Sequence, residues 1–192
     1  PHIVRGESDA LWGALLLVNA TNEVQTGLVL TAAGPGFRAT ETPLPPLVPL
    51  SVRKIGFRVE PDPATATDAW KDNDVALDLT LARPLEGEQT RPTAIDQVSV
   101  RWAVRDAGQT HRRTFVSAID GSVQYYGVVP PLQDSTDPDQ RPGLVLSLHG
   151  AGVEGEGQAN VYAAKPKVYV IAPTNRRNFG FDWEDWGRWD AL

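Results

Sequence analysis

Apolar and polar positions alternate residue by residue in the first half of the chain. Residues 75–81 and 98–105 show this pattern most clearly. A period of two is typical of half-buried antiparallel strands. Residues 11–18, 27–32 and 55–59 give three further predicted strands, separated by turns rich in proline, glycine and acidic residues. This spacing favours a β-sandwich over units in which strands alternate with helices.

A proline-rich stretch and a polar break organise the rest of this region. Residues 43–49 contain four prolines, which cannot donate the hydrogen bonds of a central strand, so we place them on a sheet edge or in a connection. The alternating pattern ends at residues 106–110, where we place a domain boundary. We therefore expect an immunoglobulin-like β-sandwich over residues 1–110 and a second domain over residues 111–192.

The second domain has a different pattern. Residues 113–118 and 122–129 read as two strands of a hairpin with the turn Asp120-Gly121 between them. Two apolar runs follow, residues 144–148 and 168–171, separated by nineteen residues. A gap of this length is enough for the crossover that parallel strands require. The predicted order is a hairpin followed by a parallel pair.

Composition and charge exclude several classes of function. The chain has no cysteine, which excludes disulfides, thiolate metal sites and a cysteine nucleophile. Eighteen basic residues against twenty-four acidic ones, with no basic cluster, argue against nucleic-acid binding. No apolar stretch is long enough to span a bilayer, and we predict no metal site and no cofactor. The first residue is Pro1 rather than methionine, which indicates an upstream piece such as a signal peptide and favours export, although the compartment stays open.

One motif carries most of the chemical information. The apolar run from Leu144 breaks directly into the turn His149-Gly150-Ala151-Gly152, and glycine suits a turn where the backbone must approach a ligand closely. A strand with this ending, after a hairpin and before a crossover to Ile171-Ala172-Pro173, resembles the opening of the α/β-hydrolase catalytic domain. It is most similar to the prolyl-oligopeptidase-type and esterase branches, over residues 113–192. The resemblance implies that residues 111–192 form an incomplete α/β-hydrolase domain.

The resemblance also implies a role for the turn. In that family, the loop after this strand donates a backbone N–H to the oxyanion of the tetrahedral intermediate, and Ala151 and Gly152 match that position. Each such donor lowers the barrier by about 3 kcal/mol. The alternative is a glycine-rich turn that binds no ligand. His149 is expected to brace the turn rather than to act as a base, because the family's catalytic histidine lies near the C-terminus.

The nucleophile is missing from the sequence. The elbow motif Gly-x-Ser-x-Gly is absent, and the three histidines have no convincing partner. We therefore expect the catalytic triad beyond Leu192, so that this chain is the N-terminal portion of a serine hydrolase and is inactive alone. Its expected partners are an ester or peptide substrate and the remainder of its own catalytic domain.

Aromatic residues suggest where a substrate binds. The segment 175–190 holds three of the six tryptophans, and we predict that Arg176, Trp183 and Trp186 contact the substrate, with the alternative that the aromatic side chains pack against the missing part of the domain. A rival interpretation of the whole chain is a non-catalytic binding or adhesion module. In that case the tryptophans of the first domain, Trp12, Trp70 and Trp102, would stack on carbohydrate.

Overall fold

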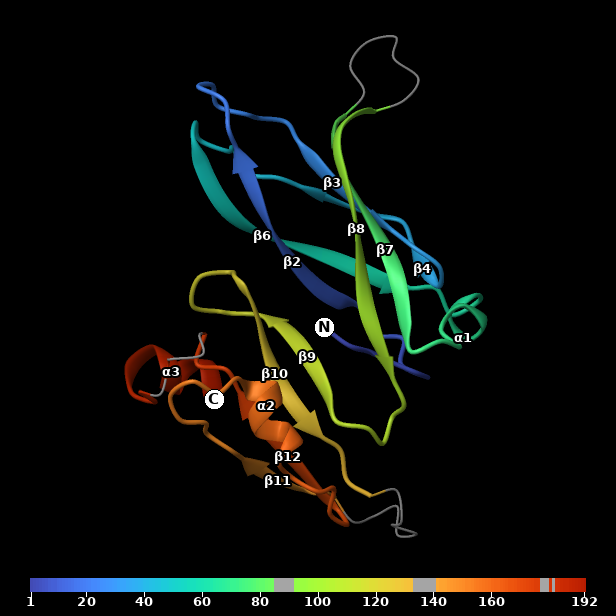
Figure 1. Cartoon of the computed structure of the whole chain (residues 1–192), viewed down its shortest axis with the longest axis vertical. Helices are drawn as coiled ribbons and strands as arrows, with labels where there is room; N and C mark the ends of the chain where they lie inside the picture. Colours follow the sequence, from blue (N-terminus) through green and yellow to red (C-terminus); the bar gives the residue numbers. More distant parts are fainter. Residues whose placement is uncertain (85–91, 133–140, 177–179, 181) are drawn as a thin grey trace. The chain divides into compact units, whose positions relative to one another are not determined.

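A computed structural model of the chain describes residues 1–84, 92–132, 141–176, 180 and 182–192. The chain folds as two compact units. Unit 1 comprises residues 1–6 and 105–192, and unit 2 comprises residues 7–104. In both units more residues lie in strands than in helices, and the helices are few and short (Figure 1).

Unit 2 consists of two antiparallel sheets. Three strands lie in the order β2-β6-β4, and four others lie in the order β8-β7-β3-β5. Their bounds are β2 (Leu11–Asn19), β3 (Val29–Ala33), β4 (Phe37–Arg38), β5 (Thr40–Pro43), β6 (Ser51–Pro61), β7 (Asp74–Arg83) and β8 (Thr93–Arg105), and the short helix α1 (Ala66–Ala69) lies between β6 and β7. The five strands predicted in this region are confirmed. The edge strand β5 ends at Pro43, the first residue of the proline-rich stretch, and the rest of that stretch lies in the connection to β6.

Aromatic side chains fill the core between the two sheets of unit 2. The Phe57 ring on β6 stacks on Trp102 of β8, with ring centroids 6.2 Å apart. Phe37 contacts both Trp102 and Trp70. Because large aromatic groups join residues from both sheets, they hold the sheets face to face. This arrangement agrees with the predicted β-sandwich.

Unit 1 is built on a four-stranded sheet in the order β9-β10-β12-β11. Its elements are β1 (Ile3–Val4), β9 (His111–Val116), β10 (Val123–Val129), β11 (Gly143–Leu146), α2 (Gly155–Asn160), β12 (Val168–Pro173) and α3 (Asp185–Ala191). Strand β10 is antiparallel to both β9 and β12, whereas β11 and β12 are parallel. The predicted hairpin and the predicted parallel pair are therefore both confirmed.

Helix α2 covers one face of this sheet. Its Ala159 is fully buried against Val129 of β10 and against Val170 and Ala172 of β12. The helix approaches closely because β10 has glycine at position 127, where a Cβ atom would lie only 2.6 Å from a carbonyl oxygen of α2. On the opposite face, the side chains of β10 and β12 line a cavity, which is described below.

The N-terminal segment belongs to unit 1, although we expected it in the first domain. The His2 amide donates a hydrogen bond to the Arg112 carbonyl at 3.0 Å, and the Arg5 amide donates one to the Arg105 carbonyl at 2.9 Å. Residues from both ends of the sequence therefore build this unit.

The structure contradicts the predicted α/β-hydrolase domain over residues 111–192. Among the described residues, far more lie in strands than in helices. An α/β domain places helices on both faces of a mainly parallel sheet, but two of the three strand pairings in unit 1 are antiparallel. The crossover between β11 and β12 contains a helix of six residues only. The fold is mainly β, and the sequence pattern did not show how little of the crossover is helical.

No helix within the described ranges is long and apolar enough to cross a membrane.

Candidate functional site

The turn that follows β11 is the best candidate for a site. The parallel strands β11 and β12 have their carboxyl ends at the same end of the sheet. The turn from His149 to Gly152 follows β11 at that end. Gly152 has φ of 79°, a left-handed conformation that glycine adopts at little cost. The Val153 amide donates a hydrogen bond to the Gly150 carbonyl oxygen at 3.4 Å, and this bond closes the turn.

The ring of His149 is buried under this turn and holds it in place. Its Nδ1 lies 2.9 Å from the Gly150 carbonyl oxygen, and its Nε2 lies 2.9 Å from the Thr174 carbonyl oxygen at the end of β12. Both ring nitrogens thus face backbone carbonyl oxygens, and neither points toward a position where a nucleophile could bind. His149 braces the turn, as predicted.

Trp183 fixes the same turn from the other side. Its indole Nε1 donates a hydrogen bond to the His149 carbonyl at 3.0 Å, and its ring meets the imidazole edge-on with centroids 5.2 Å apart. Trp183 was predicted to contact substrate, and the structure places it against the turn. Its contacts hold the backbone of residues 149–152 in one conformation.

The amides of Ala151 and Gly152 remain available. Both residues are exposed, and among the described residues neither amide has an intramolecular hydrogen-bond acceptor. Backbone N–H groups in a fixed turn form a local site of positive partial charge. This turn can therefore receive an anionic oxygen at its exposed surface.

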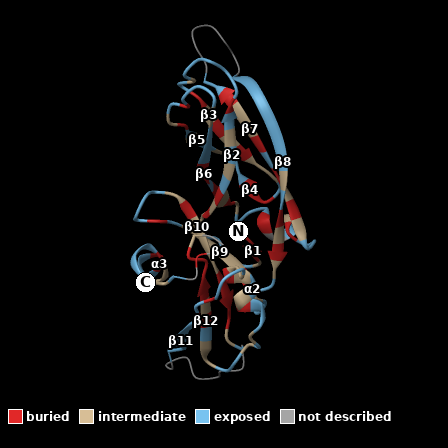
Figure 2. Ribbon diagram, turned by 60° about the vertical axis from the view of Figure 1, so that its left-hand side comes forward, coloured by how far each residue is buried: buried red, intermediate tan, exposed pale blue. Residues whose placement is uncertain are grey.

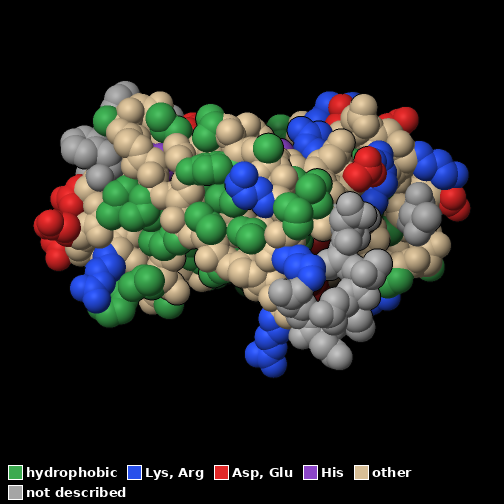
Figure 3. All heavy atoms as spheres, turned by 90° about the horizontal axis from the view of Figure 1, so that it is seen from below, with side chains coloured by type: hydrophobic (Ala, Val, Ile, Leu, Met, Phe, Trp, Pro, Cys, Tyr) green, Lys and Arg blue, Asp and Glu red, His purple; other side chains and the backbone are tan. Residues whose placement is uncertain are grey.

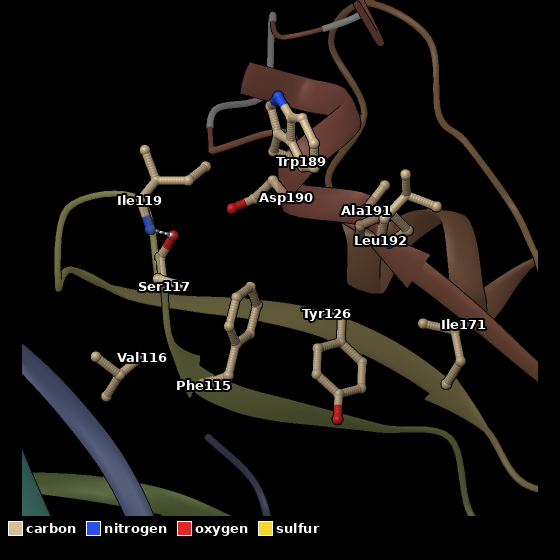
Figure 4. A pocket seen from close by; sticks show the side chains of 12 residues that line it. Phe115, Val116, Ser117, Ile119, Tyr126, Ile171, Trp189, Asp190, Ala191 and Leu192 are labelled. Carbon is tan, nitrogen blue, oxygen red and sulfur yellow. Dashed lines mark hydrogen bonds between the residues drawn. The ribbon is translucent and has the colours of Figure 1, made fainter. Parts of the chain in front are cut away.

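A cavity opens at the same end of the sheet. Its volume is about 570 Å³, within the range of small-molecule sites. The sheet face opposite α2 contributes the side chains of Phe115, Tyr126 and Ile171 to the cavity. Trp189 of α3 lies on the other side of the cavity from them (Figure 4). Because its walls are largely hydrophobic, the cavity suits an apolar group.

Arg176 contacts two residues of the cavity wall, Ser117 and Asp190, within a cluster of charged and polar groups. Its Nη1 bonds to an Asp120 oxygen at 2.8 Å and its Nη2 to the Ser117 hydroxyl at 2.5 Å. Its Nε lies 3.4 Å from Asp190, and its guanidinium lies 5.5 Å from the centroid of the Trp186 ring. Arg176 was predicted to meet a substrate group, but its hydrogen-bonding groups face protein partners. Trp186 is exposed next to it.

The two carboxylates of the cluster differ in their electrostatics. Hydrogen bonds from Arg176 and Ser122 hold the pKa of Asp120 well below its usual range. The side chain of Asp190 is almost fully buried, and neither of its oxygens has a hydrogen-bond partner among the described residues. Burial raises the pKa of Asp190, although the nearby Arg176 opposes the shift. The ionised form of Asp190 is thus disfavoured by its surroundings.

Of the three tryptophans predicted to bind carbohydrate, two are inaccessible, and the third, Trp12 of β2, is half-buried. Trp70 and Trp102 are buried in the core of unit 2, so they cannot stack on a sugar at its surface. In the part of the chain that the structure describes, no group of three or more His, Asp or Glu residues could hold a metal ion.

Sequence reasoning found the turn but missed what surrounds it. Ser117 and Asp190 lie more than seventy residues apart in the sequence, and both line the cavity around Arg176. The polar triplet beneath the turn was also missed: the Ser147 hydroxyl lies 2.8 Å from the Tyr162 hydroxyl and accepts from Gln158 at 2.9 Å. A hydroxyl residue within the apolar run was the one available signal.

Comparison of this chain with protein-family models, curated proteins and solved structures finds no match.

Proposed function

We propose that the turn at residues 149–152 is an oxyanion-binding element for acyl transfer on an ester or peptide substrate. The observation that carries the proposal is the pair of exposed amides of Ala151 and Gly152, which have no acceptor among the described residues. Such donors, held in place before the reaction, stabilise the charge that develops on a carbonyl oxygen when it becomes tetrahedral.

The rigidity of the turn supports this role. Contacts from His149 and Trp183 fix the backbone before any ligand arrives. Donors that are already in place need no reorganisation during the reaction, and each such donor lowers the barrier by about 3 kcal/mol. The cavity at the same end of the sheet would take an apolar part of the substrate.

In this proposal the chain contributes the oxyanion site, and the nucleophile and its base come from residues outside this sequence. His149 is unsuited to be the base, since both of its ring nitrogens face carbonyl oxygens. Arg176 would hold Ser117 of the cavity wall in place rather than bind the substrate, because its guanidinium is hydrogen-bonded to Asp120 and Ser117.

The first experiment measures anion binding at the turn. We expect titration of the ¹⁵N-labelled protein with a methyl alkylphosphonate, which carries a tetrahedral anionic group, to shift the amide resonances of Ala151 and Gly152 in a saturable way. The neutral dimethyl ester should leave them in place. Ala151→Pro removes one donor and should weaken binding, whereas Ala107→Pro, in the exposed turn closed by Asp106 and Gln109, should not. Shifts that do not saturate, or that survive Ala151→Pro unchanged, would contradict the proposal.

The second experiment measures ester hydrolysis by the protein as its natural gene encodes it. For hydrolysis of 4-nitrophenyl butyrate, Ala151→Pro should lower kcat about 100- to 1000-fold, because it removes a hydrogen bond that is stronger in the transition state than in the bound substrate. KM should change much less. An equal loss in the Ala107→Pro control would point to general unfolding instead.

A further inference from the structure

The outer edge of β11 has no neighbour. The Gly143 amide donates to the Lys167 carbonyl and the Ser147 amide donates to the Ile171 carbonyl, both at 2.8 Å. Residues 143, 145 and 147 therefore direct their backbone groups to β12, and the alternate residues Leu144, Leu146 and Leu148 direct theirs away from it. Within the described residues, no strand pairs with this edge.

This edge is also strongly apolar. Leu144, Val145, Leu146 and Leu148 are 69, 45, 40 and 45% exposed, and the strand is drawn in the colour of exposed residues in Figure 2. No charged residue lies between Gly143 and Leu148. Parallel strands are usually buried on both faces, and exposed edges usually carry charges or prolines that prevent pairing. An edge with these properties favours the addition of another strand.

The apolar surface continues from the edge onto the sheet. Leu144 lies opposite Tyr169, and Leu146 lies opposite Ile171, so these side chains share the sheet face that carries the cavity. Hydrophobic side chains lie open over broad areas in the view of Figure 3. A strand added to β11 would extend this surface, and its own apolar residues would cover part of Leu144 and Leu146.

We propose that β11 pairs with β11 of a second copy of this chain, antiparallel and centred on Leu146. In this register Leu146 meets its own copy, and Leu144 meets Leu148 of the second copy. All three residues have outward-facing backbone groups, so each pair can exchange two hydrogen bonds. Centring on Leu144 instead would place Pro142 opposite Leu146 and lose a donor.

The sequence of the edge suits a symmetric pair. Residues 144–148 read Leu-Val-Leu-Ser-Leu, nearly the same in both directions, and carry no charge. Antiparallel self-pairing therefore places no like charges opposite each other. A two-fold axis through Leu146 gives a closed dimer, because the β11 edge of each copy is paired with that of the other and cannot bind a third copy. The proposal does not depend on acyl transfer at the neighbouring turn.

Sedimentation equilibrium of the whole chain over a range of concentrations tests the proposal. We expect a reversible dimer. Leu146→Lys places two lysines side by side on the axis and should raise the dissociation constant at least about 100-fold. Val161→Lys is the matched control, because Val161 is an equally apolar side chain that is 73% exposed beyond the end of α2. This variant should dimerise like the parent.

Amide hydrogen exchange of the unmodified protein gives an independent readout that needs no variant. Exchange at Leu144 and Leu146 should slow at least about tenfold between dilute and concentrated samples, since pairing protects these amides. Three outcomes would overturn the proposal: a monomer at all concentrations, a dimer that Leu146→Lys does not weaken, and association without protection of these two amides. The last outcome would indicate a dimer formed through another surface.

Discussion

Lowering the pH should reduce the stability of unit 1, because protonation of His2 weakens the packing of the N-terminal segment against the rest of that unit. The buried ring of His2 accepts a hydrogen bond from the Arg112 amide at its Nδ1, at 3.2 Å, so it must be neutral there. Its Nε2 lies 3.5 Å from the Glu156 carboxylate. Burial lowers the pKa of His2 to about 4, although Glu156 pulls it in the opposite direction.

The sign and size of the effect follow from linkage. The pKa of His2 is about 4 in the folded protein and about 6.5 in the unfolded chain. Between these values the unfolded state binds the extra proton, so the free energy of unfolding decreases as the pH falls through this window. The loss amounts to about 2 kcal/mol between pH 7 and pH 5, and approaches about 3 kcal/mol below pH 4.

Urea unfolding at pH 7, 6 and 5 checks this, with backbone resonances of β10 as the probe of unit 1. His2→Gln keeps a side chain that can accept the Arg112 hydrogen bond but does not titrate, so its unfolding free energy should vary much less over this range. The reasoning would be refuted if the variant kept the full pH dependence of the parent. A His2 pKa near 6.5 in an NMR titration of the folded protein would refute it as well.

Four other substitutions test the packing and electrostatics around the site. His149→Ala should lower the free energy of unfolding by about 3 kcal/mol, because it removes two contacts to carbonyls and leaves a void; Trp183→Phe, which loses only the indole donor, should cost about 1 kcal/mol in the same denaturation assay. Gly155→Ala would place a Cβ atom 2.5 Å from a carbonyl oxygen of β12 and should cost about 1 to 3 kcal/mol, while Gly157→Ala, which meets only one side chain at 3.8 Å, should cost little. Asp190→Asn should stabilise the protein at pH 7, because burial raises the pKa of Asp190 and stability is therefore lost as the pH rises through the folded pKa. The advantage of the asparagine should vanish below pH 4, and its persistence there would contradict the assigned cause.

Local pattern was enough to predict most strands of this chain. Large apolar residues occupy positions 75, 77 and 79, with smaller or polar residues between them, and their side chains are buried on one face of β7. The parallel pair β11 and β12 also followed from two apolar runs and the gap between them. In both cases the period and the spacing lie within a short stretch of sequence.

Features that depend on distant residues could not be predicted in this way. A gap of nineteen residues permits a long crossover helix, but only Gly155–Asn160 is helical, so the α/β class was wrong. Arg176 was predicted to meet a substrate group, but the sequence did not indicate its partner Asp120, which lies 56 positions away. Which partner a guanidinium chooses is decided by tertiary packing, which single-sequence periodicity does not contain.

Unit 2 is inserted between two parts of unit 1. A backbone hydrogen bond between Arg5 and Arg105 joins these two parts where the insertion begins and ends. The chain leaves unit 1 after Gly6 and returns to it at Arg105. The Arg5 amide donates a hydrogen bond to the Arg105 carbonyl oxygen at 2.9 Å. The exit and return points are thus neighbours, as in proteins that tolerate a guest module between two adjacent backbone positions. Because these two points lie side by side, a linker of a few residues would be long enough to join Gly6 to Arg105 in place of residues 7–104.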